Sequence, residues 1–209
     1  EYKLPIGCDV PETIILADGD FPSHPLALEW LRQCPYVVCC DGAANTYIRS
    51  GRMPEAIVGD GDSLLPDIKE RYASLIHSEA EQETNDLSKA FRFCLSQERK
   101  RITIMGATGK REDHTIGNVS LLADYMEQAE VSMMTDYGIF VPIREDSMFE
   151  SYIGQQISVF NMNSTALSAE GLAYPLSVFT NWWQGTLNEA LARHFIIRTE
   201  GKVLVFRVF

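Results

Sequence analysis

Two aspartates one residue apart follow a short apolar run, in the stretch Ile57-Val58-Gly59-Asp60-Gly61-Asp62-Ser63. In an extended chain alternate side chains point to the same side, so the carboxylates of Asp60 and Asp62 can aim at one point. Gly61 between them lets the backbone approach a ligand closely. Paired hard oxygen donors suit Mg²⁺ or Mn²⁺, usually with a phosphate on the same metal. The alternative is a solvated turn, and this stretch alone does not separate the two.

Other apolar runs also end in acidic or glycine-rich segments. Asp18 to Asp20 follow the first run, Asp41 and Asn45 follow the second, and Gly106 to Gly109 follow a later one. Asp86 lies in the first turn of a predicted helix. In a parallel sheet, ligands bind at the carboxyl ends of the strands, where these segments would gather. The pattern therefore predicts a metal and phosphate site at one edge of a sheet.

Three further charged residues could act on a phosphate. Lys89 is three residues after Asp86, on nearly the same helix face, although an exposed ion pair worth a few tenths of a kcal/mol is the alternative. Arg111 offers a positive charge and Asp113 a carboxylate for metal or proton transfer, or simply a helix N-cap. Gly106 to Gly109 offer backbone N–H groups to a phosphate, or form a plain turn.

Several better-known motifs are absent. Gly109-Lys110-Arg111 lacks the earlier glycine of a Walker A loop, where Ile104 stands, and lacks Ser or Thr after the lysine. No dinucleotide-binding G-x-G-x-x-G and no nucleophile elbow is present. An EF-hand loop is excluded because Leu64 and Pro66 would occupy ligand positions.

The segments that must position these residues alternate between strand and helix patterns. Strands are predicted at 13–17, 36–40, 56–58, 75–76, 102–105 and 131–135, and helices at 25–33, 43–50, 67–73, from an N-cap at Thr84 onward, and from Asp113 to about Gln128. Such alternation predicts an α/β fold with a doubly wound, mostly parallel sheet. Residues 1–137 are expected to form this α/β domain.

The pattern changes after about residue 138. Short β-rich runs recur at 147–153, 156–160, 166–169, 195–199 and 203–208, with residues 200–202 expected to form a hairpin turn between the last two. Residues 138–209 are therefore expected to form a second, all-β domain.

Composition narrows the functional classes. The formal net charge of −11 argues against a nucleic-acid partner but not against a nucleotide held through a metal, and it suits a cationic small molecule. The five cysteines are odd in number and include no Cys-x-x-Cys pair, which predicts reduced thiols and a cytoplasmic location. No apolar run is long enough for a membrane span, and no signal peptide is evident.

Six motifs in order resemble the thiamine pyrophosphokinase (thiamine diphosphokinase) family, over nearly the whole chain. The family patterns are Asp-Gly-(Gly/Ala)-Ala-Asn, Gly-Asp-x-Asp-Ser, Gln-x-x-x-Asp-x-x-Lys-Ala, a glycine-rich Arg-x-Asp-His, Gly-Leu-x-Tyr-Pro-Leu and Ser-Asn-Glu. Their counterparts here are Asp41–Asn45, Gly59–Ser63, Gln82–Ala90, Gly106–His114, Gly171–Leu176 and Gly185–Glu189.

The resemblance implies transfer of a pyrophosphoryl group from ATP to the hydroxyethyl oxygen of thiamine, with release of AMP. It implies that residues 1–137 are a nucleotide-binding catalytic domain, that residues 138–209 are a β-sandwich domain for thiamine binding and dimerisation, and that the protein is a homodimer with active sites at the subunit interface. By this resemblance Asp60, Asp62 and Asp86 match magnesium ligands, and the nucleotide and phosphate site matches Asp41, Asn45, Ser63, Gln82, Lys89, Arg111 and Asp113 together with the glycine loop. Tyr174 matches an aromatic against thiamine, and Gly185 to Asn188, with Thr186, match a loop at its pyrimidine.

Two departures and two rivals accompany this interpretation. Leu187 replaces the usual serine, so Thr186 is a substitute hydrogen-bond partner, and Ala107 replaces a glycine of the phosphate loop. Trp182 and Trp183 are expected in core or dimer packing, with stacking on thiamine as the alternative. The rivals are an Asp-x-Asp nucleotide-sugar transferase and a nucleotide- or thiamine-sensing module without turnover. The residues alone leave Asp62, Asp86 and Asp113 equal as proton acceptors.

Overall fold

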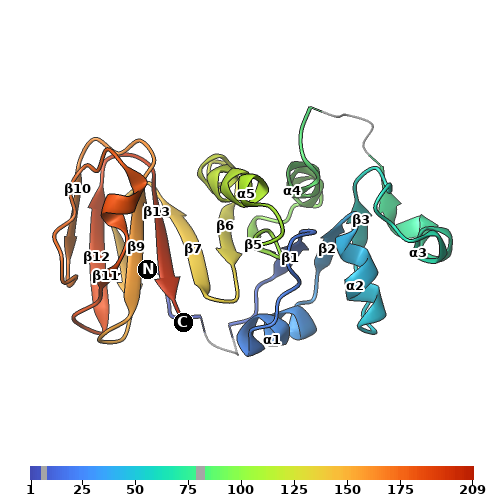
Figure 1. Ribbon diagram of the computed structural model, residues 1–209, viewed down its shortest axis with the longest axis horizontal. Helices are drawn as coiled ribbons and strands as arrows, with labels where there is room; N and C mark the ends of the chain where they lie inside the picture. The colour runs from blue at the N-terminus through green and yellow to red at the C-terminus, as the bar shows by residue number, and fades with distance from the viewer. Residues whose placement is uncertain (6–8, 79–82) are drawn as a thin grey trace.

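A computed structural model describes residues 1–5, 9–78 and 83–209 of the chain. In these segments the strands form a main sheet of ten and a second sheet of three (Figure 1). None of the helices in the described ranges has the length and apolarity needed to cross a membrane.

The parallel half of the main sheet follows the predicted runs. Its strands are β1 (Thr13–Leu16), β2 (Val37–Cys40), β3 (Ala56–Val58), β4 (Ile76–His77), β5 (Arg101–Met105) and β6 (Glu130–Met134), in the order β6-β5-β1-β2-β3-β4. All five neighbouring pairs are parallel, and Ile15 of β1 lies opposite Val38 and Ile104. Parallel strands buried on both faces read as continuous apolar runs, which is what made them recognisable.

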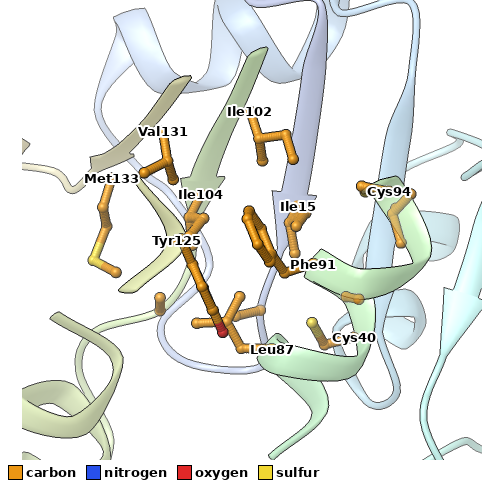
Figure 2. Close-up of a cluster of buried hydrophobic side chains, with 14 of the residues drawn as sticks. Ile15, Cys40, Leu87, Phe91, Cys94, Ile102, Ile104, Tyr125, Val131 and Met133 are labelled. Carbon is orange, nitrogen blue, oxygen red and sulfur yellow. The ribbon is translucent and has the colours of Figure 1, made fainter. Parts of the chain in front are cut away.

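Helices cover both faces of this half, as a doubly wound sheet requires (Figure 1). One face carries α1 (Pro25–Gln33), α2 (Ala43–Arg49) and α3 (Pro66–Arg71), which a short 3₁₀ turn, η1 (Ala73–Leu75), follows; the other carries α4 (Asp86–Ser96) and α5 (Glu112–Tyr125). Figure 2 shows the second of these cores, in which the rings of Phe91 and Tyr125 stack 3.9 Å apart over Ile15 and Ile104. The predicted α/β class is confirmed.

Two helix starts differ from the predictions. Asn85, not Thr84, caps α4, because its side chain accepts the Ser88 N–H at 2.9 Å while the Thr84 hydroxyl faces Arg92. Asp113 is not an N-cap but the second residue of α5, which begins at Glu112 and ends at Tyr125. Single-residue shifts of this kind arise because several neighbouring polar residues can each serve as a cap.

The rest of the chain extends the same sheet and adds a second one. β7 (Gly138–Ile143) pairs antiparallel with β6, and the sheet continues through β13 (Val203–Val208), β9 (Gln156–Asn161) and β11 (Asn188–Glu189). The second sheet holds β8 (Ser147–Glu150), β12 (His194–Thr199) and β10 (Leu167–Glu170), and a 3₁₀ turn, η2 (Trp182–Gly185), precedes β11. The main sheet thus runs unbroken across the expected boundary at residue 137.

The predicted hairpin at residues 200–202 is wrong. β12 pairs with β8 and β10 in the small sheet, whereas β13 pairs with β7 and β9 in the main sheet. Phe195 and Ile197 of β12 share one buried cluster with Val203 and Val205 of β13. The turn therefore passes from one layer of the sandwich to the other, because burying these apolar faces against each other outweighs local pairing.

Truncation of the aromatic pair tests the second core. Phe91→Ala should lower the free energy of unfolding by about 3–5 kcal/mol, because it removes a ring that is 2% exposed and leaves Tyr125 without its stacking partner. Ile116→Ala is the control, since Ile116 is 58% exposed on α5. Urea unfolding followed by circular dichroism measures both, and equal small losses would contradict this packing.

Candidate active site

The loop after β3 carries the paired aspartates and is held by hydrogen bonds to Asp41, which follows β2, and to Asn45 of α2. The Oδ2 atom of Asp41 accepts the Ser63 N–H at 3.0 Å. Asn45 donates to the Ser63 carbonyl at 2.8 Å and accepts the Leu65 N–H at 3.0 Å. Gly59 has no room for a side chain, since a Cβ there would stand 2.8 Å from the Asp41 Cβ. The structure thus brings Asp41, Asn45 and Ser63 together around this loop.

Within the loop, Asp60 and Asp62 are exposed and joined by an Asx turn, in which Asp60 Oδ1 accepts the Asp62 N–H at 3.0 Å. The Lys69 ammonium on α3 donates to the Gly61 carbonyl at 2.9 Å. Lys69 was not singled out in the sequence, because nothing in its spacing marks a contact to a backbone carbonyl eight residues earlier.

The first turn of α4 faces the same region. Asp86 pairs with Lys89 at 3.1 Å, and the ion pair is half-buried rather than exposed, because Lys89 is only 4% exposed while the Asp86 side chain is 36% exposed. The Cys40 thiol at the end of β2 lies 3.7 Å from the Asp86 carbonyl. A buried ammonium needs a nearby carboxylate, which ties the two residues together. Gln82, expected at this site, lies outside the described residues.

The acids at this edge interact electrostatically. Burial raises the pKa of Asp41, and the carboxylates of Asp60 and Asp86 raise it further, while the Ser63 N–H acts in the opposite direction. The Asp41 Oδ1 atom is buried and has no hydrogen-bond partner. An unpaired buried carboxylate oxygen among other carboxylates is costly, and a bound cation would offset that cost.

The glycine loop after β5 is bound to the loop after β1. The Gly19 N–H donates to the Gly106 carbonyl at 2.6 Å, and the Asp20 N–H donates to the Thr108 carbonyl at 2.8 Å. Lys110 bridges the same two loops through an ion pair of 3.1 Å with Asp18. Lys110 is thus used to join two loops, a role that its failed match to a Walker A motif did not indicate.

The side chains of Arg111 and Asp113 pair with each other. Their side chains form an ion pair at 2.5 Å, and both are more than 60% exposed. The Arg111 guanidinium holds the pKa of Asp113 below its ordinary value, and the carboxylate raises the pKa of Arg111. A carboxyl with a lowered pKa is a weaker base.

A second group of expected residues gathers in the sandwich. The Asn188 amide donates to the Tyr174 carbonyl at 2.9 Å and accepts the Tyr174 N–H at 3.0 Å. The Thr186 hydroxyl donates to the Trp183 carbonyl at 2.7 Å, so in this conformation it is engaged within the loop. A hollow of about 360 Å³ is lined by Tyr174, Pro175, Phe179 and residues 184–188.

Leu187 and the tryptophan pair sit at or beside this hollow. Leu187 lines it, is 77% exposed and has a left-handed φ of 63°. The ring centroids of Trp182 and Phe160 lie 6.1 Å apart in an edge-to-face arrangement, while Trp183 is 73% exposed. Trp182 is therefore partly packed on the sandwich, and Trp183 is not.

The two groups of residues occupy opposite ends of one sheet. Asn188 lies in β11, the first strand of the ten-strand order, and Asp60 follows β3, the ninth. Eight steps of about 4.8 Å separate these strands by roughly 38 Å along the sheet. Figure 1 shows the same separation of β11 from β3.

Among the described residues, the carboxylates of Asp60, Asp62 and Asp86 do not lie close enough together to bind one metal ion in this conformation. In the described part of the chain, a close group of three potential metal ligands lies instead in the sandwich. It consists of Glu1, Glu150 and His194, whose ligand atoms lie within 4.8 Å of one another. Glu1 and His194 are exposed, and the Glu150 carboxylate accepts the Leu4 N–H at 3.1 Å. Such surface groupings of acidic side chains are common in proteins without a bound ion.

The structure is an α/β protein in which acidic residues and a glycine loop follow the carboxyl ends of the parallel strands, and in which the same sheet continues into a β-sandwich. Residues 27–134 match the family description "Thiamin pyrophosphokinase, catalytic domain", and residues 138–206 match "Thiamin pyrophosphokinase, substrate-binding domain". The chain belongs to the thiamin pyrophosphokinase family.

Individual relatives agree with this assignment. The chain is 30% identical to thiamine pyrophosphokinase 1 of Oryza sativa subsp. japonica over 50% of this chain and 49% of that protein, and 34% identical to thiamine pyrophosphokinase of Bacillus subtilis over 39% and 40%. The matched stretch thus spans about half the length of the curated relatives.

Solved structures share the fold. A Bacillus subtilis thiamine pyrophosphokinase superposes with a TM-score of 0.78 at 20% identity, covering 94% of this chain and 98% of that one. The yeast enzyme superposes with a TM-score of 0.79 at 17% identity, covering 100% and 91%.

Removal of the Asp41 charge should stabilise the protein. In buffer with EDTA, Asp41→Asn should raise the thermal midpoint by about 2–4 °C, because a buried carboxylate beside two others becomes a neutral amide that can still accept the Ser63 N–H. Asp67→Asn on α3 is the matched control, since it removes the same charge from an exposed position. A lower midpoint for Asp41→Asn than for the control would show that Asp41 is not under electrostatic strain.

Proposed function

We propose that this chain is a thiamine diphosphokinase, which transfers a pyrophosphoryl group from ATP to the hydroxyethyl oxygen of thiamine and releases thiamine diphosphate and AMP. The observation that carries the proposal is the gathering at one sheet edge of Asp41, Asp60 and Asp86, whose carboxylates interact, beside the linked loops after β1 and β5. Membership of the family supports it further.

The residues fit a divalent cation. Asp60, Asp62 and Asp86 would hold Mg²⁺, or Mn²⁺, because these ions prefer hard oxygen ligands, and the unpartnered Asp41 oxygen beside them indicates a place where positive charge is needed. The bound ion would supply neutralisation of phosphate oxygens.

The chain's own residues would then bind and orient the substrates. Backbone N–H groups at Gly106 and Gly109 offer donors to phosphate oxygens, and the buried Lys89 would stabilise charge developing during transfer. Arg111 would assist once released from Asp113, and Asn45 and Ser63 position the aspartate loop. Asp62, Asp86 or Asp113 would accept the proton of the thiamine hydroxyl, since each offers a carboxylate at this edge of the sheet.

Thiamine would bind at the sandwich hollow of a second copy. Tyr174 offers an aromatic face to the thiazolium cation and Thr186 offers a hydroxyl to the pyrimidine. Asn188 is 5% exposed and bonded to the Tyr174 backbone, so it would act at the thiamine site by holding Tyr174 in place. Because these residues and the aspartates lie some 38 Å apart along the sheet of one chain, a complete site needs the aspartate edge of one subunit and the sandwich of its partner. This supports a homodimer in which residues 1–137 and 138–209 act as nucleotide-binding and thiamine-binding halves.

A cytoplasmic location is part of the proposal. The four cysteines that the structure describes (Cys34, Cys39, Cys40 and Cys94) are free thiols, as expected in a reducing compartment, and Cys8 lies outside the described residues.

One assay separates the proposal from its rivals. ATP, Mg²⁺ and thiamine are incubated with the protein, and AMP and thiamine diphosphate are followed by chromatography. A sensing module would bind ligand without forming product, and a nucleotide-sugar transferase would form no AMP.

The paired aspartates can be tested by one isosteric change. Asp62→Asn should lower kcat by at least about 100-fold, because an amide is a poor ligand for Mg²⁺, while the thermal midpoint stays near that of the wild type. Asp67→Asn again serves as the charge control. Turnover like that of the wild type would remove Asp62 from the metal site.

The aromatic contact can be tested through the Michaelis constants. Tyr174→Ala should raise KM for thiamine roughly tenfold and leave KM for ATP nearly unchanged, because a cation–π contact of about 1–2 kcal/mol is lost. Trp183→Ala, on the same surface but outside the hollow, is the comparison. Equal changes in both Michaelis constants for Tyr174→Ala would argue against stacking.

The shared site predicts complementation between inactive subunits. Asp62→Asn and Asn188→Ala proteins, each inactive alone, should regain about a quarter of wild-type activity after equal mixing and subunit exchange, since half of the dimers are mixed and each contains one intact site. No recovery, with subunit exchange verified by mass spectrometry, would place both groups of residues within one chain's site.

A further inference from the structure

Asn118, in the second turn of α5, is not among the site residues predicted from the sequence, but it connects two parts of the site. It is half-buried, and its Nδ2 group donates to the Ala107 carbonyl at 2.8 Å. Its Oδ1 atom accepts the Asn85 Nδ2 group at 3.3 Å. One amide side chain thus contacts both the glycine loop and the residue that caps α4.

The glycine loop needs such contacts because its backbone is intrinsically free. Gly106 and Gly109 have left-handed φ angles of 64° and 77°, a region open to glycine but with little preference for any one conformation. Contacts with residues 19 and 20 hold the loop to the β1 side. The bond from Asn118 to Ala107 holds it to the α5 side, at a residue that is itself 3% exposed.

The other half of the Asn118 amide acts on α4. Asn85 uses its Oδ1 atom to cap the Ser88 N–H and its Nδ2 group to reach Asn118. Asp86 and Lys89 occupy the turn that this cap begins. The orientation of the Asp86–Lys89 pair is therefore linked to the glycine loop through two consecutive hydrogen bonds.

We propose that Asn118 is a positioning residue that fixes the glycine loop relative to the α4 turn carrying Asp86 and Lys89. This inference rests on the proposed function, because it assumes that the loop and the turn act on the same Mg²⁺–nucleotide ligand. Asn118 touches neither ligand in this role. It sets the distance between two elements that do, so its loss affects the nucleotide and not thiamine.

The test compares Asn118→Leu and Asn118→Ala with Ser120→Ala. Ser120 is the matched control, because its hydroxyl donates to the Gly117 carbonyl at 2.7 Å within the same helix. Loss of the Asn118 bridge should raise KM for ATP about tenfold and weaken binding of Mg²⁺ with α,β-methylene-ATP, measured by calorimetry, by a similar factor. KM for thiamine should change less than about twofold, and Ser120→Ala should match the wild type.

A double-mutant cycle then separates positioning from general destabilisation. Asn85→Ser keeps a capping oxygen but removes the donor to Asn118, so its effect on analogue binding should combine with that of Asn118→Leu to less than the product of the two. Variants that lose thermal stability but bind the analogue like the wild type, or multiplicative effects in the cycle, would overturn the inference.

The two proposals fail in different ways. If the wild type forms no thiamine diphosphate but the Asn118 variants still weaken analogue binding, the proposed function is wrong and the positioning role stands. If the wild type is active and both Asn118 variants show unchanged KM for ATP, the positioning role is wrong and the function stands.

Discussion

Parallel pairing of β1 with β2 and β5 is the constraint on which the whole site depends. Because these strands and β3 run in one direction, their carboxyl ends meet at one edge, and the four short loops that follow them must share that edge. Hydrogen bonds between neighbouring loops fix their positions: Asp41 bonds to Ser63, Gly19 to Gly106, and Asp20 to Thr108. The geometry of the site is therefore a property of the sheet and not of any one loop.

This arrangement places like charges together, at an electrostatic cost. Asp41 is buried with one oxygen unpartnered, and Asp60 and Asp86 add to the rise in its pKa. Lys89 offsets part of that cost by pairing with Asp86 from a buried position. A protein selected for stability alone would not retain this distribution, whereas a protein that binds a cation with a polyphosphate gains from it. The strain is thus consistent with the ligand that the family membership leads one to expect.

The continuity of the main sheet joins the second half of the chain to the first. β7 pairs with β6, so the sandwich is built on the edge of the α/β sheet and the two halves share one framework. That same continuity fixes β11 and β3 far apart, and the hollow beside Tyr174 cannot meet the aspartates of its own chain along the sheet. This separation supports the proposal that one site is completed by a second copy of the chain.

The sequence by itself determined the α/β class, the parallel strands and the six family motifs, because buried strands are continuous apolar runs and the acids follow them directly. It did not reveal β7, whose Pro142 weakens a strand pattern, or the crossing of residues 200–202 between layers, because local spacing cannot distinguish a hairpin from a turn between sheets. Only the tertiary structure decided that Arg111 pairs with Asp113, that Lys89 is buried, and that Asn118 reaches both Ala107 and Asn85. Those contacts join residues distant in sequence or depend on which side chain competes best for a partner, and that competition is settled by packing in three dimensions.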